Sequence, residues 1–230
     1  MGQSNLAVVC CLWSGWPAPE WSEEYVYRLY RGVKRNLLAP HDFICFADDP
    51  ARLDGAPFEV RPLKAVSWMG CLPKLYVYSP EAGLSGRVLL LDLDNVITGP
   101  LDDIAAYNGD MCVRAWFRGW DKGLRDKRKH PELIDGDMIS FRPSADTDLL
   151  WQQLKDDPKG CEQKTGGRER WYIRERLTPD LWQEVVPGQI ASWKNHMQNG
   201  QVPKNARIVS CHGYPRPHEI NQDWIREHWV

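Results

Sequence analysis

The sequence predicts an α/β fold, with a mostly parallel central sheet flanked by helices, in a single domain that spans residues 1–230. Two observations support this prediction. Apolar segments of strand length alternate with segments of helical periodicity, and short connections rich in Gly and Pro separate them. In addition, 230 residues suffice for one generous domain, and the sequence contains no internal repeat or low-complexity segment.

The first half of the chain gives the clearest alternation. Residues 6–13 form an apolar run that reads as a buried strand, which Ser14, Gly15 and Pro17 break. Apolar side chains at helical spacing then predict a helix over 20–38. The remaining elements of this half are expected to be strands over 41–47, 58–63 and 87–91, a helix over 69–78 that carries Lys74, and an extended segment over 95–101.

The second half has a less regular pattern. Strands are expected over 111–117, 134–141 and 206–211, and helices over 148–155 and 168–177. The Gly-rich passage between the two helices is expected to be a loose loop. In a parallel sheet, ligands gather beyond the carboxyl ends of the strands. Ser14, Asp48, Asp92 and Asp94 would all lie at that edge.

Composition gives no general attraction to nucleic acid or membrane, because 29 basic residues face 31 acidic ones for a net charge of −2. Twelve tryptophans suit a heavy core or a site that stacks on sugars or bases. Seven cysteines, an odd count without C-x-x-C spacing, predict free buried thiols in a reducing compartment. The first apolar run lacks a basic leader and is too short to span a bilayer. We therefore expect a soluble, cytoplasmic protein without a transmembrane segment.

The segment Arg87-Val-Leu-Leu-Leu-Asp92-Leu-Asp94-Asn-Val-Ile97 places two acids inside an apolar run. Buried carboxylates are unfavourable unless a cation or a set of hydrogen bonds compensates them. Residues i and i+2 of an extended chain point to the same side, so Asp92 and Asp94 can face one divalent metal ion. The alternative is a strand end followed by an acidic turn, and the long aliphatic lead-in argues against it.

A second polar element follows the last predicted strand, at His212-Gly-Tyr-Pro-Arg216-Pro. A lone histidine in this position is most often structural. Here, however, an imidazole can complete a metal site begun by two carboxylates, and an arginine four residues on can bind a phosphate with two hydrogen bonds. Asp92, Asp94, His212 and Arg216 together would fit a metal-bound diphosphate, whose departure from a sugar creates negative charge.

With these motifs, the sequence resembles nucleotide-sugar glycosyltransferases of the GT-A (Rossmann-like) fold, and is most similar to the retaining glycosyltransferase family 8, the galactosyltransferase and glycogenin-like group. The residues that carry the resemblance are Leu89–Asp94 as the D-x-D strand, His212–Pro217 as the C-terminal H-x-G-x-K-P element, and Lys74 as the donor-binding lysine. The resemblance implies a nucleotide-sugar and metal-binding half over 1–105, and an acceptor half over 106–230 that ends in the metal-ligand turn.

The resemblance also implies ligands and roles. Asp94 and His212 would bind Mn²⁺ or Mg²⁺, with Asp92 on the metal or the ribose. Arg216 would replace the usual lysine on the diphosphate beside Gly213. The donor would be a nucleoside-diphosphate sugar, with a UDP-sugar as the first choice, whose nucleoside the segment Trp13-Ser14-Gly15 would hold. The enzyme would be a hexosyl- or pentosyltransferase that acts on a hydroxyl acceptor with retention.

Two departures from the family pattern point to an unusual acceptor. Asp135-Gly-Asp137 stands where the family tends to have Asn-Ser/Ala-Gly, and Arg168-Glu169 stands where it tends to have Asp-Gln. Asp135, Asp137 and Glu169 are therefore the catalytic acids to test first, although a turn acid, a strand end and a solvated helix face explain them equally well. A further candidate for the acceptor pocket is the segment Ser192-Trp-Lys with His196. The alternative is that these residues only pack against their neighbours.

The segment Arg118–His130 carries six Lys or Arg against two Asp and is expected to be a surface loop or a poorly ordered flap. Together with nearby aromatic residues, these cations suit an anionic acceptor. Such an acceptor would be a phosphorylated glycan, a lipopolysaccharide core, or a hydroxymethylated base in phage-type DNA. A solvated basic loop is the alternative.

Two other classes of protein remain open. A sugar nucleotidylyltransferase also combines metal-binding acids with an α/β sheet, but it needs a Gly-rich basic loop after the first strand, which Trp13–Pro19 does not provide. A non-catalytic sugar-nucleotide or carbohydrate-binding protein would bind the donor without slow hydrolysis in the presence of Mn²⁺.

Overall fold

The computed structural model describes residues 5–15, 21–126, 129–130, 133–197 and 200–230. Its main feature is a seven-stranded sheet with the order β3-β2-β1-β4-β7-β6-β8, beside a three-stranded sheet with the order β5-β10-β9. The strands are β1 (Leu6–Leu12), β2 (Asp42–Ala47), β3 (Glu59–Pro62), β4 (Arg87–Leu91), β5 (Asn95–Ile97), β6 (Met111–Ala115), β7 (Ile134–Phe141), β8 (Asp180–Leu181), β9 (Ile190–Ser192) and β10 (Ile208–Ser210).

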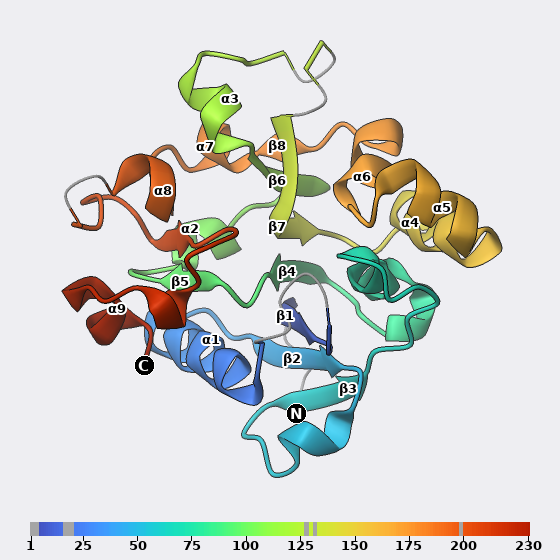
Figure 1. Cartoon of the computed structure of the whole chain (residues 1–230), viewed down its shortest axis with the longest axis horizontal. Helices are drawn as coiled ribbons and strands as arrows, with labels where there is room; N and C mark the ends of the chain where they lie inside the picture. The colour runs from blue at the N-terminus through green and yellow to red at the C-terminus, as the bar shows by residue number, and fades with distance from the viewer. Residues whose placement is uncertain (1–4, 16–20, 127–128, 131–132, 198–199) are drawn as a thin grey trace.

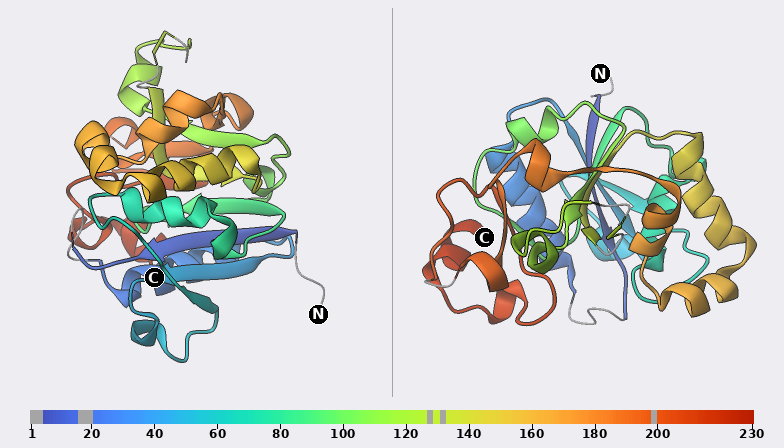
Figure 2. Two further views of the ribbon diagram at one scale, coloured as in Figure 1. Left: turned by 90° about the vertical axis from the view of Figure 1, so that its right-hand side faces the viewer. Right: turned by 90° about the horizontal axis from the view of Figure 1, so that it is seen from above.

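Helices cover both faces of the large sheet (Figure 1). Helix α1 and the C-terminal elements lie on one face, and η2 with α4 to α6 lies on the other, as the view from above shows (Figure 2). The α-helices are α1 (Glu23–Asn36), α2 (Asp102–Ala105), α3 (Phe117–Asp121), α4 (Ala145–Asp156), α5 (Pro158–Thr165), α6 (Arg170–Arg176), α7 (Trp182–Val185), α8 (Trp193–His196) and α9 (Asp223–His228). The 3₁₀ helices are η1 (Pro50–Leu53), η2 (Leu72–Tyr78), η3 (Pro80–Ala82) and η5 (Pro217–Glu219).

The predicted fold class is confirmed. Strands β3, β2, β1 and β4 are parallel to one another, and β6 is parallel to β8. Strand β7 runs antiparallel between β4 and β6. Strands β1, β4 and β6 are buried along their whole length, which explains their continuous apolar sequences.

Three predicted elements differ from the structure. The expected helix over 69–78 is a 3₁₀ helix, η2, with all seven residues buried. The Gly-rich passage before residue 168 contains a helix, α5, which Asp157 caps by accepting a hydrogen bond from the Gly160 amide and which ends at Gly166 with φ +57°. The basic segment 118–130 begins within helix α3, and part of it lies outside the described residues.

The small sheet brings distant segments together. Strand β10 pairs with β5, which directly follows the D-x-D segment. The Cys211 amide donates to the Asp94 carbonyl (3.0 Å), and the Asp92 amide donates to the Asp137 carbonyl (2.9 Å). The segments around residues 92–95, 135–137 and 210–216 therefore meet at one edge of the main sheet.

All seven cysteines are free thiols, and six of them are buried, as expected from their apolar surroundings. None of the helices in the described part of the chain is both long enough and apolar enough to cross a membrane.

Candidate active site

A cavity of about 630 Å³ opens where these segments meet. Eight of the residues singled out in the sequence line it, namely Asp92, Asp94, Asp135, Asp137, Glu169, His212, Gly213 and Arg216. Trp116, one of the aromatic residues beside the basic segment, lines it too, as do Gly136 and Arg170, in and next to the two departures from the family pattern. The lining residues that sequence reasoning did not assign to a site are Trp21, Cys71, Arg114 and Arg174. Arg168, named only as a departure from the family pattern, lines it as well.

The first acid of the D-x-D segment is held by Lys74, which lies behind the cavity wall. The Lys74 Nζ is 2.8 Å from Asp92 Oδ1, 2.8 Å from Glu169 Oε1 and 3.0 Å from the Gly136 carbonyl. Burial lowers the pKa of Lys74, but the two carboxylates outweigh burial and hold it well above its ordinary value. Burial raises the pKa of Asp92 to about 7, against the opposing effect of Lys74.

The second acid, Asp94, forms an ion pair with Arg216, in which Nη1 and Oδ2 are 2.5 Å apart. Both side chains are 6% exposed. Burial raises the pKa of Asp94, although Arg216 opposes this effect. The other carboxylate oxygen, Oδ1, is buried and has no hydrogen-bond partner among the described residues. A buried carboxylate oxygen without a donor is a position at which a cation would be stabilised.

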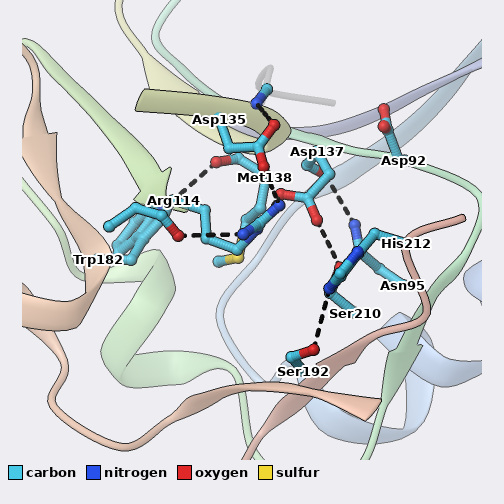
Figure 3. Close-up of polar contacts among 12 residues, drawn as sticks. Asp92, Asn95, Arg114, Asp135, Asp137, Met138, Trp182, Ser192, Ser210 and His212 are labelled. Atoms are coloured by element: carbon cyan, nitrogen blue, oxygen red, sulfur yellow. Dashed lines mark hydrogen bonds and ion pairs between the residues drawn. The ribbon is translucent and has the colours of Figure 1, made fainter. Parts of the chain in front are cut away.

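A second cluster of charges forms around the buried Arg114 (Figure 3). Its Nη2 is 2.7 Å from Asp135 Oδ2, and its Nε donates to Asp137 Oδ1. Asp137 also accepts from the Ser210 hydroxyl (2.5 Å), while Asp135 pairs with Arg170 Nη1 (2.8 Å). Two acids at i and i+2 of β7 therefore face one guanidinium, as the strand period requires.

These contacts bear on the three proposed catalytic acids. Burial alone would raise the pKa of Asp135, but Arg114 and Arg170 hold it well below its usual range, so this group is a carboxylate at neutral pH. Asp137 accepts hydrogen bonds on both carboxylate oxygens, and Glu169 is paired with Lys74. All three line the cavity while held by neighbouring polar groups.

His212 lines the same cavity but forms its own contacts. Its Nε2 is 2.9 Å from the Ser192 hydroxyl, and its ring stacks on Phe117 with centroids 6.0 Å apart. Burial and the nearby Arg114 lower its pKa, which favours the neutral imidazole that a metal requires. Among the described residues, however, no three His, Cys, Asp or Glu side chains converge as a metal-binding group. The fit to a divalent cation therefore rests on Asp92 and on Asp94 with its unpartnered oxygen.

The predicted nucleoside segment lies outside the cavity lining. Trp13 is buried, with its ring edge against Trp21 (centroids 5.3 Å apart). The Ser14 amide donates to Asp48 Oδ2 (2.8 Å), and Gly15 adopts a φ of +109° that favours glycine. Of this region, Trp21 lines the cavity. That this segment holds the nucleoside stays a prediction.

Comparison with known proteins supports the fold. No family model matches the sequence, and no curated protein sequence is significantly similar to it. Many solved structures are similar to it, and two of them have 11% sequence identity to this chain. One, titled WbbM bifunctional glycosyltransferase, superposes with a TM-score of 0.56 over 97% of this chain and 51% of its own. The other, the glycosyltransferase GlyE of Streptococcus pneumoniae, has a TM-score of 0.58 over 94% of this chain and 56% of its own. This chain thus spans about half the length of each, and it has the fold of these glycosyltransferases.

Proposed function

We propose that this protein is a metal-dependent glycosyltransferase, which moves a sugar from a nucleoside-diphosphate sugar to a hydroxyl acceptor with retention. The observation that carries the proposal is the placement of Asp92 and Asp94. Both acids follow the end of β4 directly and line the cavity. Asp94 Oδ1 lacks a hydrogen-bond partner among the described residues. The fold shared with two glycosyltransferases agrees with this function.

In this proposal, Asp92 and Asp94 would hold Mn²⁺ or Mg²⁺, and His212 would join them in place of its contact with Ser192. When bound, the cation neutralises charge on the diphosphate as it leaves the sugar. A UDP-sugar is the donor that we expect from the sequence resemblance.

Two cations of the chain itself would assist the departure of the diphosphate. Arg216 is poised beside Asp94 and can turn its guanidinium to the phosphate oxygens, where two parallel hydrogen bonds are available. Lys74 holds Asp92 from behind and fixes the direction of its carboxylate. Both groups are buried, so water does not screen their charges strongly.

The transfer also needs a group that accepts the proton of the acceptor hydroxyl. Asp135 is ionised at neutral pH, which a base requires, but Arg114 and Arg170 hold it. Asp137 and Glu169 are similarly engaged. We propose that these acids orient the cavity's arginine and lysine side chains, and that an oxygen of the departing phosphate takes the proton, as the sequence resemblance implies.

The test is slow hydrolysis of the donor. The full chain is incubated with a panel of nucleotide sugars and Mn²⁺, and the released nucleoside diphosphate is measured with and without EDTA. We expect one donor to release nucleoside diphosphate, and EDTA should abolish this release. Asp94→Asn should lower the rate of release by at least about a hundredfold, since the leaving group loses its cation.

One observation favours a non-catalytic sugar-nucleotide-binding protein as the second candidate. Each of the five acids that line the cavity has a cationic partner: Lys74 for Asp92 and Glu169, Arg216 for Asp94, and Arg114 for Asp135 and Asp137. Tight binding of a nucleotide sugar without any release of nucleoside diphosphate would support this candidate and contradict the transferase.

A further inference from the structure

The cavity has a second group of cations in α6 and just before it, apart from the C-terminal turn. Arg168, Arg170 and Arg174 line the cavity there. Figure 1 places α6 on one side of the sheet end and the C-terminal elements on the other. These arginines are thus separate from Arg216, which we assign to the diphosphate of the donor.

Contacts with β7 fix two of these arginines. Arg170 Nη1 is 2.8 Å from Asp135 Oδ1, and Arg174 Nη2 donates to the Ile134 carbonyl (2.8 Å). Arg168 is exposed and has no carboxylate within ion-pair distance among the described residues. Arg168 therefore offers its full charge to a ligand in the cavity.

The described side chains in and directly behind the cavity wall have a net positive charge, which favours the binding of one more anion. Its carboxylates are the five already described, while its cations are Arg114, Arg168, Arg170, Arg174 and Arg216, with Lys74 directly behind the wall. The cations thus exceed the acids by one. A donor diphosphate that arrives with its own divalent cation does not change this balance. The excess charge is available to the acceptor.

Exposed indole rings accompany the α6 arginines. Trp171 follows Arg170 directly and is 37% exposed, and the Arg174 guanidinium lies 5.2 Å from the centre of its ring. Trp116, which lines the cavity, is 39% exposed. Indole rings pack well against the C–H face of a sugar while their edges stay in water. Arginines and indoles side by side suit a ligand that is both a sugar and an anion.

We propose that the acceptor is an anionic saccharide, whose phosphate or carboxylate is bound by Arg168 and Arg174 in the cavity that the exposed Trp116 also lines. This inference rests on the proposed function, because it takes the saccharide to be the acceptor of a sugar transfer. The cavity volume of about 630 Å³ is that of a small-molecule site. A nucleic acid duplex would instead need a row of phosphate contacts along the surface.

Binding of model acceptors to the full chain tests the inference. Calorimetry with UDP and Mn²⁺ present compares glucose 6-phosphate, glucuronate, neutral glucose and a short DNA duplex. We expect at least one of the two anionic saccharides to bind about tenfold more tightly than glucose, because charge-assisted hydrogen bonds to a guanidinium are strong. The tighter of the two tells whether phosphate or carboxylate is the preferred anion.

Variants locate the site. Arg168→Gln should weaken binding of the anionic saccharide about tenfold and leave binding of glucose unchanged, whereas Arg168→Lys should retain part of the preference. Arg226→Gln, at an exposed arginine on α9, is the matched control and should change nothing. Arg118→Gln tests the basic segment that the sequence suggested, and a larger loss there than at Arg168 would overturn the assignment to α6.

The remaining outcomes separate the two proposals. Donor hydrolysis together with equal binding of glucose and both anionic saccharides would overturn the anionic acceptor and leave the transferase standing. Tighter binding of the DNA duplex than of any saccharide would also overturn it. Binding of an anionic saccharide that depends on Arg168, without hydrolysis of any donor, would support the anion site and contradict the transferase.

Discussion

The ion pair between Asp94 and Arg216 is the residue-scale feature on which the site depends most. Because both side chains are buried, removing Asp94 deprives Arg216 of a buried counter-charge that water does not replace. We therefore predict that Asp94→Ala lowers the free energy of unfolding in metal-free buffer by about 3–5 kcal/mol. The double variant Asp94→Ala/Arg216→Met should recover much of that loss, as measured by urea denaturation.

Asp223→Ala provides the control for this prediction, because Asp223 forms an ion pair with Arg226 on the exposed side of α9. Surface pairs of this kind contribute little, so no measurable change is expected there. Equal stabilities of Asp94→Ala and its double variant would show that Arg216 is not left unpaired by the loss of Asp94.

The pKa of Asp92 leads to a prediction about pH. Because the folded-state pKa is raised to about 7, above that of an unfolded chain, the native protein keeps a proton that the unfolded chain loses between about pH 4 and 7. Stability in EDTA should therefore fall as pH rises through this window, with a contribution of up to about 1.4 kcal/mol per pH unit. Asp92→Asn should flatten this part of the profile, measured by urea denaturation at pH 5, 6 and 7. An unchanged slope in the variant would assign the proton to another group.

At the residue scale, the sequence pointed to the acids and, through the resemblance, to Lys74 and Arg216, but not to Arg114, the partner of Asp135 and Asp137. Two acids within an apolar run, and a histidine after a strand, are visible signals. For Arg114, the sequence contains one signal, a single arginine within the apolar strand Met111–Ala115. For Trp21 and Arg174, the sequence contains no such signal, because their position at the cavity depends on contacts between distant segments.

At the scale of elements, the pairing of β6 with β7 forms the second charge cluster. The register shifts between Val113, opposite Ile139, and Arg114, opposite Asp135. This irregularity lets the guanidinium reach both Asp135 and Asp137. Within the described part of the chain, Arg114 is thus the one side chain with an ion pair to both acids at the cavity end of β7.

We predict that Arg114→Met lowers the free energy of unfolding by about 3–5 kcal/mol, because it leaves the buried Asp137 and the half-buried Asp135 without their shared cation. Arg142→Met, at the exposed residue that follows β7, should stay within about 0.5 kcal/mol of the parent protein. Thermal or urea denaturation measures both variants. A loss below about 1 kcal/mol for Arg114→Met would mean that Arg170 and Ser210 suffice to hold the acids.

Elements with strong periodicity were predicted well, and short ones were not. Strand β7 matches its predicted range of 134–141, because its sequence is buried almost throughout and sharply bounded. The η2 segment is too short and too tightly buried for its sequence to distinguish a 3₁₀ helix from an α-helix. Helix α5 has little apolar content, so only its Asp157-Pro158 start and its Gly166 end mark it.

At the scale of the whole molecule, the order of the strands brings the site together. The sheet places the end of β4 beside β7, and the small sheet returns the C-terminal segment to the same edge. The alternation of elements predicted the α/β class, and the two motifs predicted which segments should meet. Single-sequence patterns did not predict the small sheet, because its strands have three residues each.

The central claim is that Asp92 and Asp94 bind a nucleoside diphosphate through a divalent cation. Calorimetric titration of UDP into the full chain, with Mn²⁺ and then with EDTA, tests it most directly. We predict that UDP binds at least about tenfold more tightly with Mn²⁺ than with EDTA, and that the variant Asp92→Asn/Asp94→Asn loses this difference. Equal UDP affinity of the parent protein with Mn²⁺ and with EDTA would contradict the account.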